Sequence, residues 1–123
     1  MDLPAAPASA PAWSLRLLGD IQAHHGSQRI SRWPSRHAAA LLARLALEPL
    51  RSHPREELIE LLWPGVELTV GRNRLRQVLA TLRELLHRPG QPPVIDADRQ
   101  ALRLHPGALR CDAIDFEQLA RRG

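Results

Sequence analysis

The sequence lacks lysine and tyrosine and holds one phenylalanine and one cysteine among its 123 residues. With Cys111 as its only cysteine, the chain has no internal disulfide and no cysteine pair that could bind a metal. The scarcity of aromatic side chains argues against a platform on which single-stranded nucleic acid could stack. The chain has neither a run of roughly 18 apolar residues, the length of a membrane span, nor a signal-peptide pattern at its start. We therefore expect a cytoplasmic protein with no membrane partner.

Patterns typical of enzymes and metal sites are also missing. The sequence has no glycine-rich P-loop and no lysine to serve one. His24 and His25 are neighbours on an expected strand, where adjacent side chains point to opposite faces and do not converge on one ion. The aspartates near the C-terminal end have no serine, cysteine or histidine partner at a motif spacing. We expect no enzyme activity, no metal site and no cofactor.

The composition fits one small domain with a net positive charge. Hydrophobic residues make up 44% of the chain and charged residues 24%, which is enough apolar material for a packed core. All 17 basic residues are arginine, and they exceed the acidic residues to give a net charge of +4, which indicates an anionic partner. Residues 1–12 are rich in proline and alanine, and we expect them to form a disordered tail. Residues 13–105 are the expected domain, and 106–123 the expected linker and start of a following helical domain.

Strand patterns stand at both ends of that domain. Apolar alternation at 14–18, followed by turn signals and further short segments at 21–25 and 28–31, predicts a small antiparallel sheet. Near the other end, segments 94–97 and 101–105 are joined by a short polar turn, which is typical of a β-hairpin.

Three helical patterns lie between these strands. The first runs from Arg36 to Leu47 with Ser35 as N-cap. The second fits 54–63, with Pro54 at its first position. The third fits 69–87, with Thr69 as the cap and leucines on one face. Trp33 and Trp63 stand at helix boundaries and are expected in the core, more so than Trp13.

The third helical segment carries the positive charge of the chain. From Thr69 to Arg88, five arginines stand against Glu84 alone, and this excess of four positive charges equals that of the whole protein. Opposite the leucines, the helix presents Asn73, Gln77 and Ala80. Arginine and amide groups can pair with base edges in the major groove, and alanine leaves room for a thymine methyl group. Exposed helix faces often carry such residues for solubility alone, but the preceding helix and the following hairpin favour a recognition helix.

The same residues resemble a known family. The stretches LRLLG (15–19), SRHAAALLARLAL (35–47), REELIELLWP (55–64), RNRLRQVLATLRELL (72–86), VIDADRQALRL (94–104) and DAIDFEQL (112–119) resemble the OmpR/PhoB-type winged-helix DNA-binding domain of regulators of the Streptomyces antibiotic regulatory protein (SARP) kind. Pro54, where relatives more often have Ser or Thr, and the turn GVELT before the third helix depart from the pattern.

The resemblance implies an α+β winged helix-turn-helix, with an N-terminal antiparallel sheet, a three-helix core and a C-terminal β-hairpin wing. It also implies a bacterial transcription regulator whose third helix enters the major groove while the wing contacts the adjacent backbone or minor groove. In such regulators a helical activation domain follows, so we expect this chain to be a fragment or a truncated relative of a longer protein.

The residues expected to contact DNA belong to four segments. The third helix supplies most of them, the hairpin turn supplies one, and the starts of the second and first helices supply two weaker phosphate contacts. They are Arg72, Asn73, Arg74, Arg76, Gln77, Thr81, Arg83, Arg99, Arg55 and Arg36.

Candidate partners are double-stranded DNA, RNA polymerase and a second copy of the chain on repeated half-sites. An alternative is a winged-helix module that binds proteins without binding DNA. Interaction faces of that kind tend to carry aromatic or large apolar residues at their centre, and Asn73, Gln77 and Ala80 do not fit this description.

Overall fold

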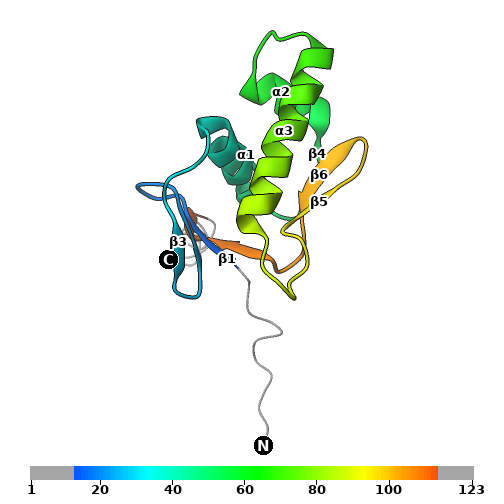
Figure 1. Ribbon diagram of the computed structural model, residues 1–123. Coiled ribbons are helices and arrows are strands. Elements are labelled where there is room, and N and C mark those ends of the chain that lie inside the picture. Colours follow the sequence, from blue (N-terminus) through cyan, green and yellow to red (C-terminus); the bar gives the residue numbers. More distant parts are fainter. Residues whose placement is uncertain (1–12, 114–123) are drawn as a thin grey trace, which may run out of the picture.

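The computed structural model describes residues 13–113 of the chain, in which short strands enclose three helices (Figure 1). In chain order the elements are β1 (Trp13–Arg16), β2 (Gln22–His25), β3 (Gln28–Ile30), α1 (Arg36–Leu47), β4 (His53–Pro54), α2 (Arg55–Leu62), α3 (Leu68–Leu86), β5 (Ile95–Ala97), β6 (Ala101–Leu104) and β7 (Leu109–Cys111).

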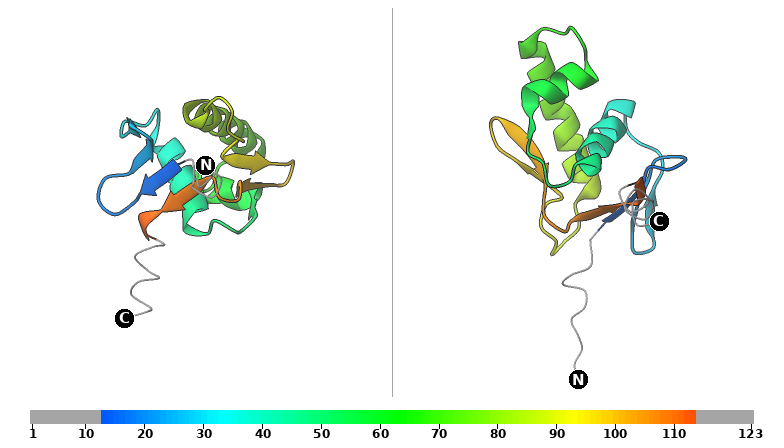
Figure 2. Two further views of the ribbon diagram at one scale, coloured as in Figure 1. Left: turned by 90° about the horizontal axis from the view of Figure 1, so that it is seen from below. Right: turned by 180° about the vertical axis from the view of Figure 1, so that it is seen from behind.

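The strands form two sheets at different ends of the helical core (Figures 1 and 2). The first has the order β3-β2-β1-β7, in which β1 pairs antiparallel with β2 and parallel with β7. The second has the order β4-β6-β5, in which the β5–β6 hairpin forms the wing and β4 pairs with β6. The expected α+β winged helix-turn-helix is thus confirmed, with one sheet before the helices and a wing after them.

The hydrophobic core joins all three helices to both sheets. Leu41, Leu42 and Leu45 of α1 and Leu58 of α2 are fully buried, and α3 buries Leu75, Leu79, Leu82 and Leu86. Strands β1 and β6 contribute Leu15 and Leu102. The leucine periodicity that predicted the helices therefore corresponds to the faces that pack together.

Helix α2 and helix α3 approach each other closely at Gly71. A Cβ atom placed on Gly71 would lie 2.3 Å from Cγ2 of Ile59 and 3.2 Å from Cγ1 of Val66. A side chain at residue 71 would fit only if Ile59 moved. The absence of a side chain at residue 71 is therefore required for this helix-turn-helix packing.

The helix predictions differ from the structure mainly at the caps. Helix α1 matches its predicted range, and the Ser35 side chain accepts a hydrogen bond from the Ala38 amide at 3.1 Å. Pro54 is the N-cap of α2 rather than its first helical residue. It is the last residue of β4, where it pairs with Ala101 of β6. The prediction of Thr69 as a cap was wrong: α3 begins at Leu68, one residue earlier, and its N-cap Glu67 makes no side-chain cap hydrogen bond.

Two strands, β4 and β7, were not predicted. Strand β7 lies beyond the predicted end at residue 105 and pairs with β1. The Asp112 carboxylate, assigned from sequence to the following segment, accepts hydrogen bonds from the amides of Leu17 at 2.7 Å and Leu18 at 3.3 Å. Residues beyond 105 thus take part in the first sheet, which is mixed rather than purely antiparallel. The predicted tail at 1–12 and the expected helical segment from 114 lie outside the described residues.

The most buried of the three tryptophans is Trp13, which the sequence favoured least. Its side chain is 1% exposed and its indole Nε1 donates to the carbonyl of Leu86 at 3.2 Å. The guanidinium of Arg88 lies 4.6 Å from the Trp13 ring centre and also donates to Gln28. Trp33 and Trp63 are only half-buried. The side chain of Arg88, counted above among the charges of the third helix, thus contacts the first sheet.

A buried histidine lies beneath the wing. His53 in β4 is fully buried; its Nε2 donates to the Glu48 carbonyl at 3.2 Å, and its Nδ1 accepts from Arg51 at 3.3 Å. This pattern fits a neutral imidazole protonated on Nε2. Burial lowers the pKa of His53 and outweighs the hydrogen bond to Glu48, and the charges of Arg44 and Arg51 lower it further.

We predict that Gly71→Ala destabilises the protein by about 1–3 kcal/mol, because the methyl group overlaps Ile59. In an unobstructed helix the same change stabilises by about 1 kcal/mol, so the sign of the effect is diagnostic. Urea denaturation followed by circular dichroism measures it. Repeating Gly71→Ala in an Ile59→Ala background should cost much less, and an equal cost in both backgrounds would contradict the steric explanation.

We also predict that acid destabilises the fold through His53. In the unfolded chain His53 takes up a proton at its ordinary pKa near 6.5, whereas in the folded chain burial lowers the pKa of His53. The contribution of neutral His53 to the free energy of unfolding is therefore complete above pH 6.5 and is lost as the pH falls below that value. Urea midpoints measured from pH 7.5 to 5 should fall more steeply for the parent than for His53→Gln. Parallel curves for the two proteins would show that His53 is not the group responsible.

Candidate nucleic-acid interface

Helix α3 turns its polar side away from the core. Gly71, Leu75, Leu79, Leu82 and Leu86 are its buried residues. All of the residues that the sequence assigned to DNA contact on this helix are exposed, namely Arg72, Asn73, Arg74, Arg76, Gln77, Thr81 and Arg83. The amide and guanidinium groups are therefore presented to solvent along the helix.

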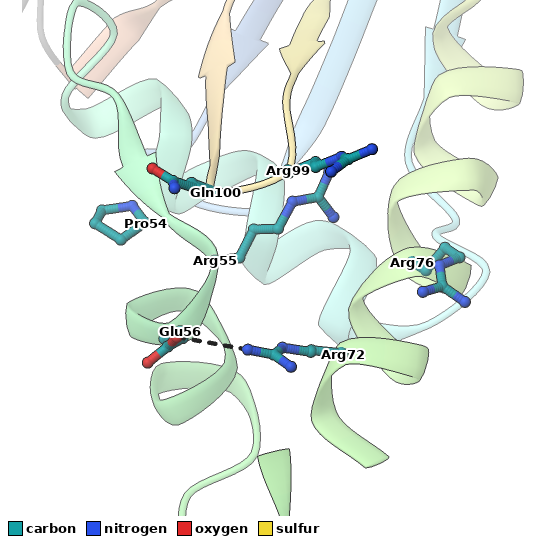
Figure 3. Close-up of a pocket in the computed structure, with 7 residues that line it drawn as sticks. All are labelled: Pro54, Arg55, Glu56, Arg72, Arg76, Arg99 and Gln100. Carbon is teal, nitrogen blue, oxygen red and sulfur yellow. Dashed lines mark ion pairs between the residues drawn. The ribbon is translucent and has the colours of Figure 1, made fainter. Parts of the chain in front are cut away.

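A groove of about 660 Å³ lies between the start of α2, helix α3 and the turn of the wing (Figure 3). Its lining residues come from three segments: Pro54, Arg55, Glu56, Arg72, Arg76, Arg99 and Gln100. The lining includes four guanidinium groups and a single carboxylate. Four of the ten arginine and polar residues predicted from separate parts of the sequence thus line one basic groove.

Two arginines that line the groove make side-chain contacts. Arg72 lies 3.7 Å from the Glu56 carboxylate, and both side chains are largely exposed, so this ion pair is weak. Arg76 donates to Oδ1 of Asn73 at 3.3 Å on the exposed side of α3. The groove keeps a strong positive excess that suits a phosphate backbone.

The turn of the wing is ordered by Asp98. Its Oδ1 accepts hydrogen bonds from the amides of Gln100 at 2.7 Å and Ala101 at 2.8 Å. These two bonds are the main reason that the pKa of Asp98 lies below its ordinary value, with a further contribution from the charge of Arg55. Aspartate stabilises turns in this way. Arg99, the residue after Asp98, is exposed as a result.

Two predicted contact residues also hydrogen-bond to the wing backbone. Arg55 donates through Nε to the Asp98 carbonyl at 2.8 Å, and Arg83 donates to the Ile95 carbonyl at 3.0 Å. Burial lowers the pKa of Arg55, and the nearby charges of Arg83 and Arg76 lower it further, whereas Asp98 opposes the shift. The hairpin is thus fastened both to α2 and to α3.

The remaining candidates lie outside the groove. Five of them are exposed on α3 and Arg36 is exposed at the start of α1; none of the six lines the groove. The five on α3 are Asn73, Arg74, Gln77, Thr81 and Arg83. The sequence reasoning missed Glu56, Asp98 and Gln100. Asp98 had a usable signal, since an aspartate before a two-residue polar turn is a common turn former.

Other kinds of site find no support in the described part of the chain. Residues 13–113 contain no group of three histidine, cysteine or carboxylate side chains that could hold a metal ion. The ring of His25 packs against Trp13 with centroids 5.2 Å apart. Within the same residues, no helix is both long and apolar enough to cross a membrane.

Comparison with solved structures adds to the evidence for the fold. The chain is similar to the DNA-binding domain of E. coli CadC, with a TM-score of 0.60 and 20% sequence identity over 78% of this chain and 88% of that one. This likeness supports the winged-helix fold. No protein-family model matches the sequence, and no curated protein matches it.

We predict that Asp98→Ala loosens the turn of the wing, because two backbone amides lose their acceptor. Hydrogen exchange of the Gln100 and Ala101 amides, followed by NMR, should accelerate several-fold. Asp98→Asn keeps an acceptor oxygen at the same position and should exchange nearly as slowly as the parent. Equal acceleration in both variants would assign the effect to charge rather than to the hydrogen bonds.

Proposed function

We propose that the chain binds double-stranded DNA in a sequence-specific manner, with α3 in the major groove and the wing on the adjacent backbone. The observation that carries this proposal is the groove in which Arg55, Arg72, Arg76 and Arg99 lie beside the exposed polar face of α3. Cationic side chains supply phosphate contacts that fix position, and amides on a helix face supply base readout. The solved structure that shares the fold is itself described as a DNA-binding domain.

The residues divide by their place on the surface. Asn73, Arg76, Gln77 and Arg83 are the proposed contacts to bases or to phosphates beside them, with Thr81 on the flank of the same face. Arg72 and Arg74 are proposed to bind phosphates near the start of α3, and Arg99 to bind from the wing. Arg55 adds charge to the groove, and Arg36 is a weaker phosphate candidate.

Within this proposal the chain acts as the N-terminal domain of a cytoplasmic bacterial transcription regulator of the OmpR/PhoB and SARP kind. Pairing of copies on repeated half-sites and contact with RNA polymerase belong to the same proposal. One such domain covers a small interface, so binding by the single chain should be weak and enhanced on repeated sites.

We predict that Arg76→Ala and Arg99→Ala weaken DNA binding in different ways. Arg76→Ala should reduce affinity for a duplex selected from a random pool by about 1–3 kcal/mol and relax base preference. Arg99→Ala should weaken binding to all duplexes alike. It should also reduce the slope of log affinity against log salt concentration by about one. Fluorescence anisotropy over a salt series measures both effects.

The matched control is Arg29→Ala, since Arg29 is an exposed arginine on β3, in the other sheet. It should leave specific binding unchanged. If Arg76→Ala and Arg99→Ala bind duplex as well as the parent at physiological salt, the proposed interface is wrong. A binding partner whose affinity hardly changes with salt would favour the protein-interaction module instead.

A further inference from the structure

Arg55 contacts the wing turn on both sides of Arg99. Its guanidinium Nε donates to the carbonyl of Asp98 at 2.8 Å. Its main-chain amide donates to the carbonyl of Gln100 at 2.7 Å. The residues before and after Arg99 are thus both fastened to the first residue of α2, and Figure 3 shows the Arg55 side chain extending toward the wing turn.

The surroundings of Arg55 differ from those of its neighbours in the groove. Arg55 is half-buried, whereas Arg72, Arg76 and Arg99 are exposed. Its Nε is committed to a backbone carbonyl, which fixes the plane of the guanidinium. A side chain held in this way is suited to support, and the exposed arginines around it are better placed to reach a phosphate.

A second hydrogen bond fastens the other end of the hairpin. Arg83 on α3 donates to the carbonyl of Ile95, the first residue of β5. The wing is therefore held at its base by α3 and at its turn by α2. Since α2 and α3 are themselves packed together at Gly71, the wing turn has a fixed position relative to the exposed face of α3.

We propose that Arg55 is a positioning residue that holds the wing turn beside α3, so that Arg99 and the α3 side chains meet one duplex together. In this role Arg55 acts through its hydrogen bond to Asp98 rather than through its charge. The inference rests on the proposed DNA binding and assigns Arg55 a different part from the phosphate contact expected from sequence.

Two substitutions separate the hydrogen bond from the charge. In Arg55→Gln the amide nitrogen stands the same number of bonds from the backbone as Nε of arginine, so the donor to Asp98 is kept and the charge is lost. In Arg55→Lys the charge is kept, but a methylene group replaces Nε. Circular dichroism checks that both variants fold.

For DNA binding, Arg55→Lys should lose about five- to tenfold in affinity, the effect of one hydrogen bond, and Arg55→Gln should lose less, although it lacks the charge. Arg99→Ala should then reduce the DNA affinity of the parent strongly. It should reduce the DNA affinity of the Arg55→Lys protein little, because the wing of that protein is already displaced. If Arg55→Lys binds as well as or better than Arg55→Gln, Arg55 acts through its charge and the proposal is wrong.

A measurement without DNA keeps this inference separate from the proposed function. Backbone ¹⁵N relaxation of Arg99 and Gln100 should show a more mobile wing turn in Arg55→Lys and an unchanged one in Arg55→Gln. Arg74→Lys, a matched change at an exposed α3 position outside the groove, should leave the turn as in the parent. An unchanged wing turn in Arg55→Lys would overturn the positioning role, whereas a parent chain that binds no duplex would overturn only the proposed function.

Discussion

Burial of the leucine stripe on α3 is the interaction on which the rest of the structure depends. Leu75, Leu79, Leu82 and Leu86 lie in the core, and each contributes about 1.5–3 kcal/mol compared with an exposed position. Rotation of α3 about its axis would bring these side chains into water. The outward direction of Asn73 and the arginines is therefore a consequence of packing on the opposite side of the helix. The close approach at Gly71 then fixes where α2 stands relative to that face.

Much of the fold could be predicted because its signals are local. Ser35 caps a helix whose apolar residues repeat at helical spacing, and the helix appears where that pattern places it. Strands β4 and β7 left no such trace, since neither is joined to its partner strand by a short turn, whereas the equally short β3 and β5 each belong to a hairpin. What makes Leu109–Cys111 a strand is pairing with β1, nearly a hundred residues away in sequence. The same long-range pairing explains why no strand was predicted beyond residue 105.

The candidate site divides in a similar way. Periodicity and charge predicted that α3 carries arginine and amide side chains, and that these lie on the face opposite the leucines. The convergence of Arg55, Arg72, Arg76 and Arg99 on one groove was not predicted, because it depends on the placement of three separate segments. The hydrogen bonds of Arg55 and Arg83 were equally hidden, since their acceptors are backbone carbonyls, which every residue type provides. Side-chain identity shows which residues can donate, and the fold decides which carbonyl is near.

The parallel pairing of β1 with β7 has a consequence for where the described chain ends. The chain leaves the sheet at Cys111, and the Asp112 carboxylate holds the amides of Leu17 and Leu18 just past the end of β1. The last described residues are therefore held in place beside the end of β1. They belong to the first sheet, whereas the basic groove is lined by α2, α3 and the turn of the second sheet. The described chain thus ends on a different part of the molecule from the surface that holds the arginines.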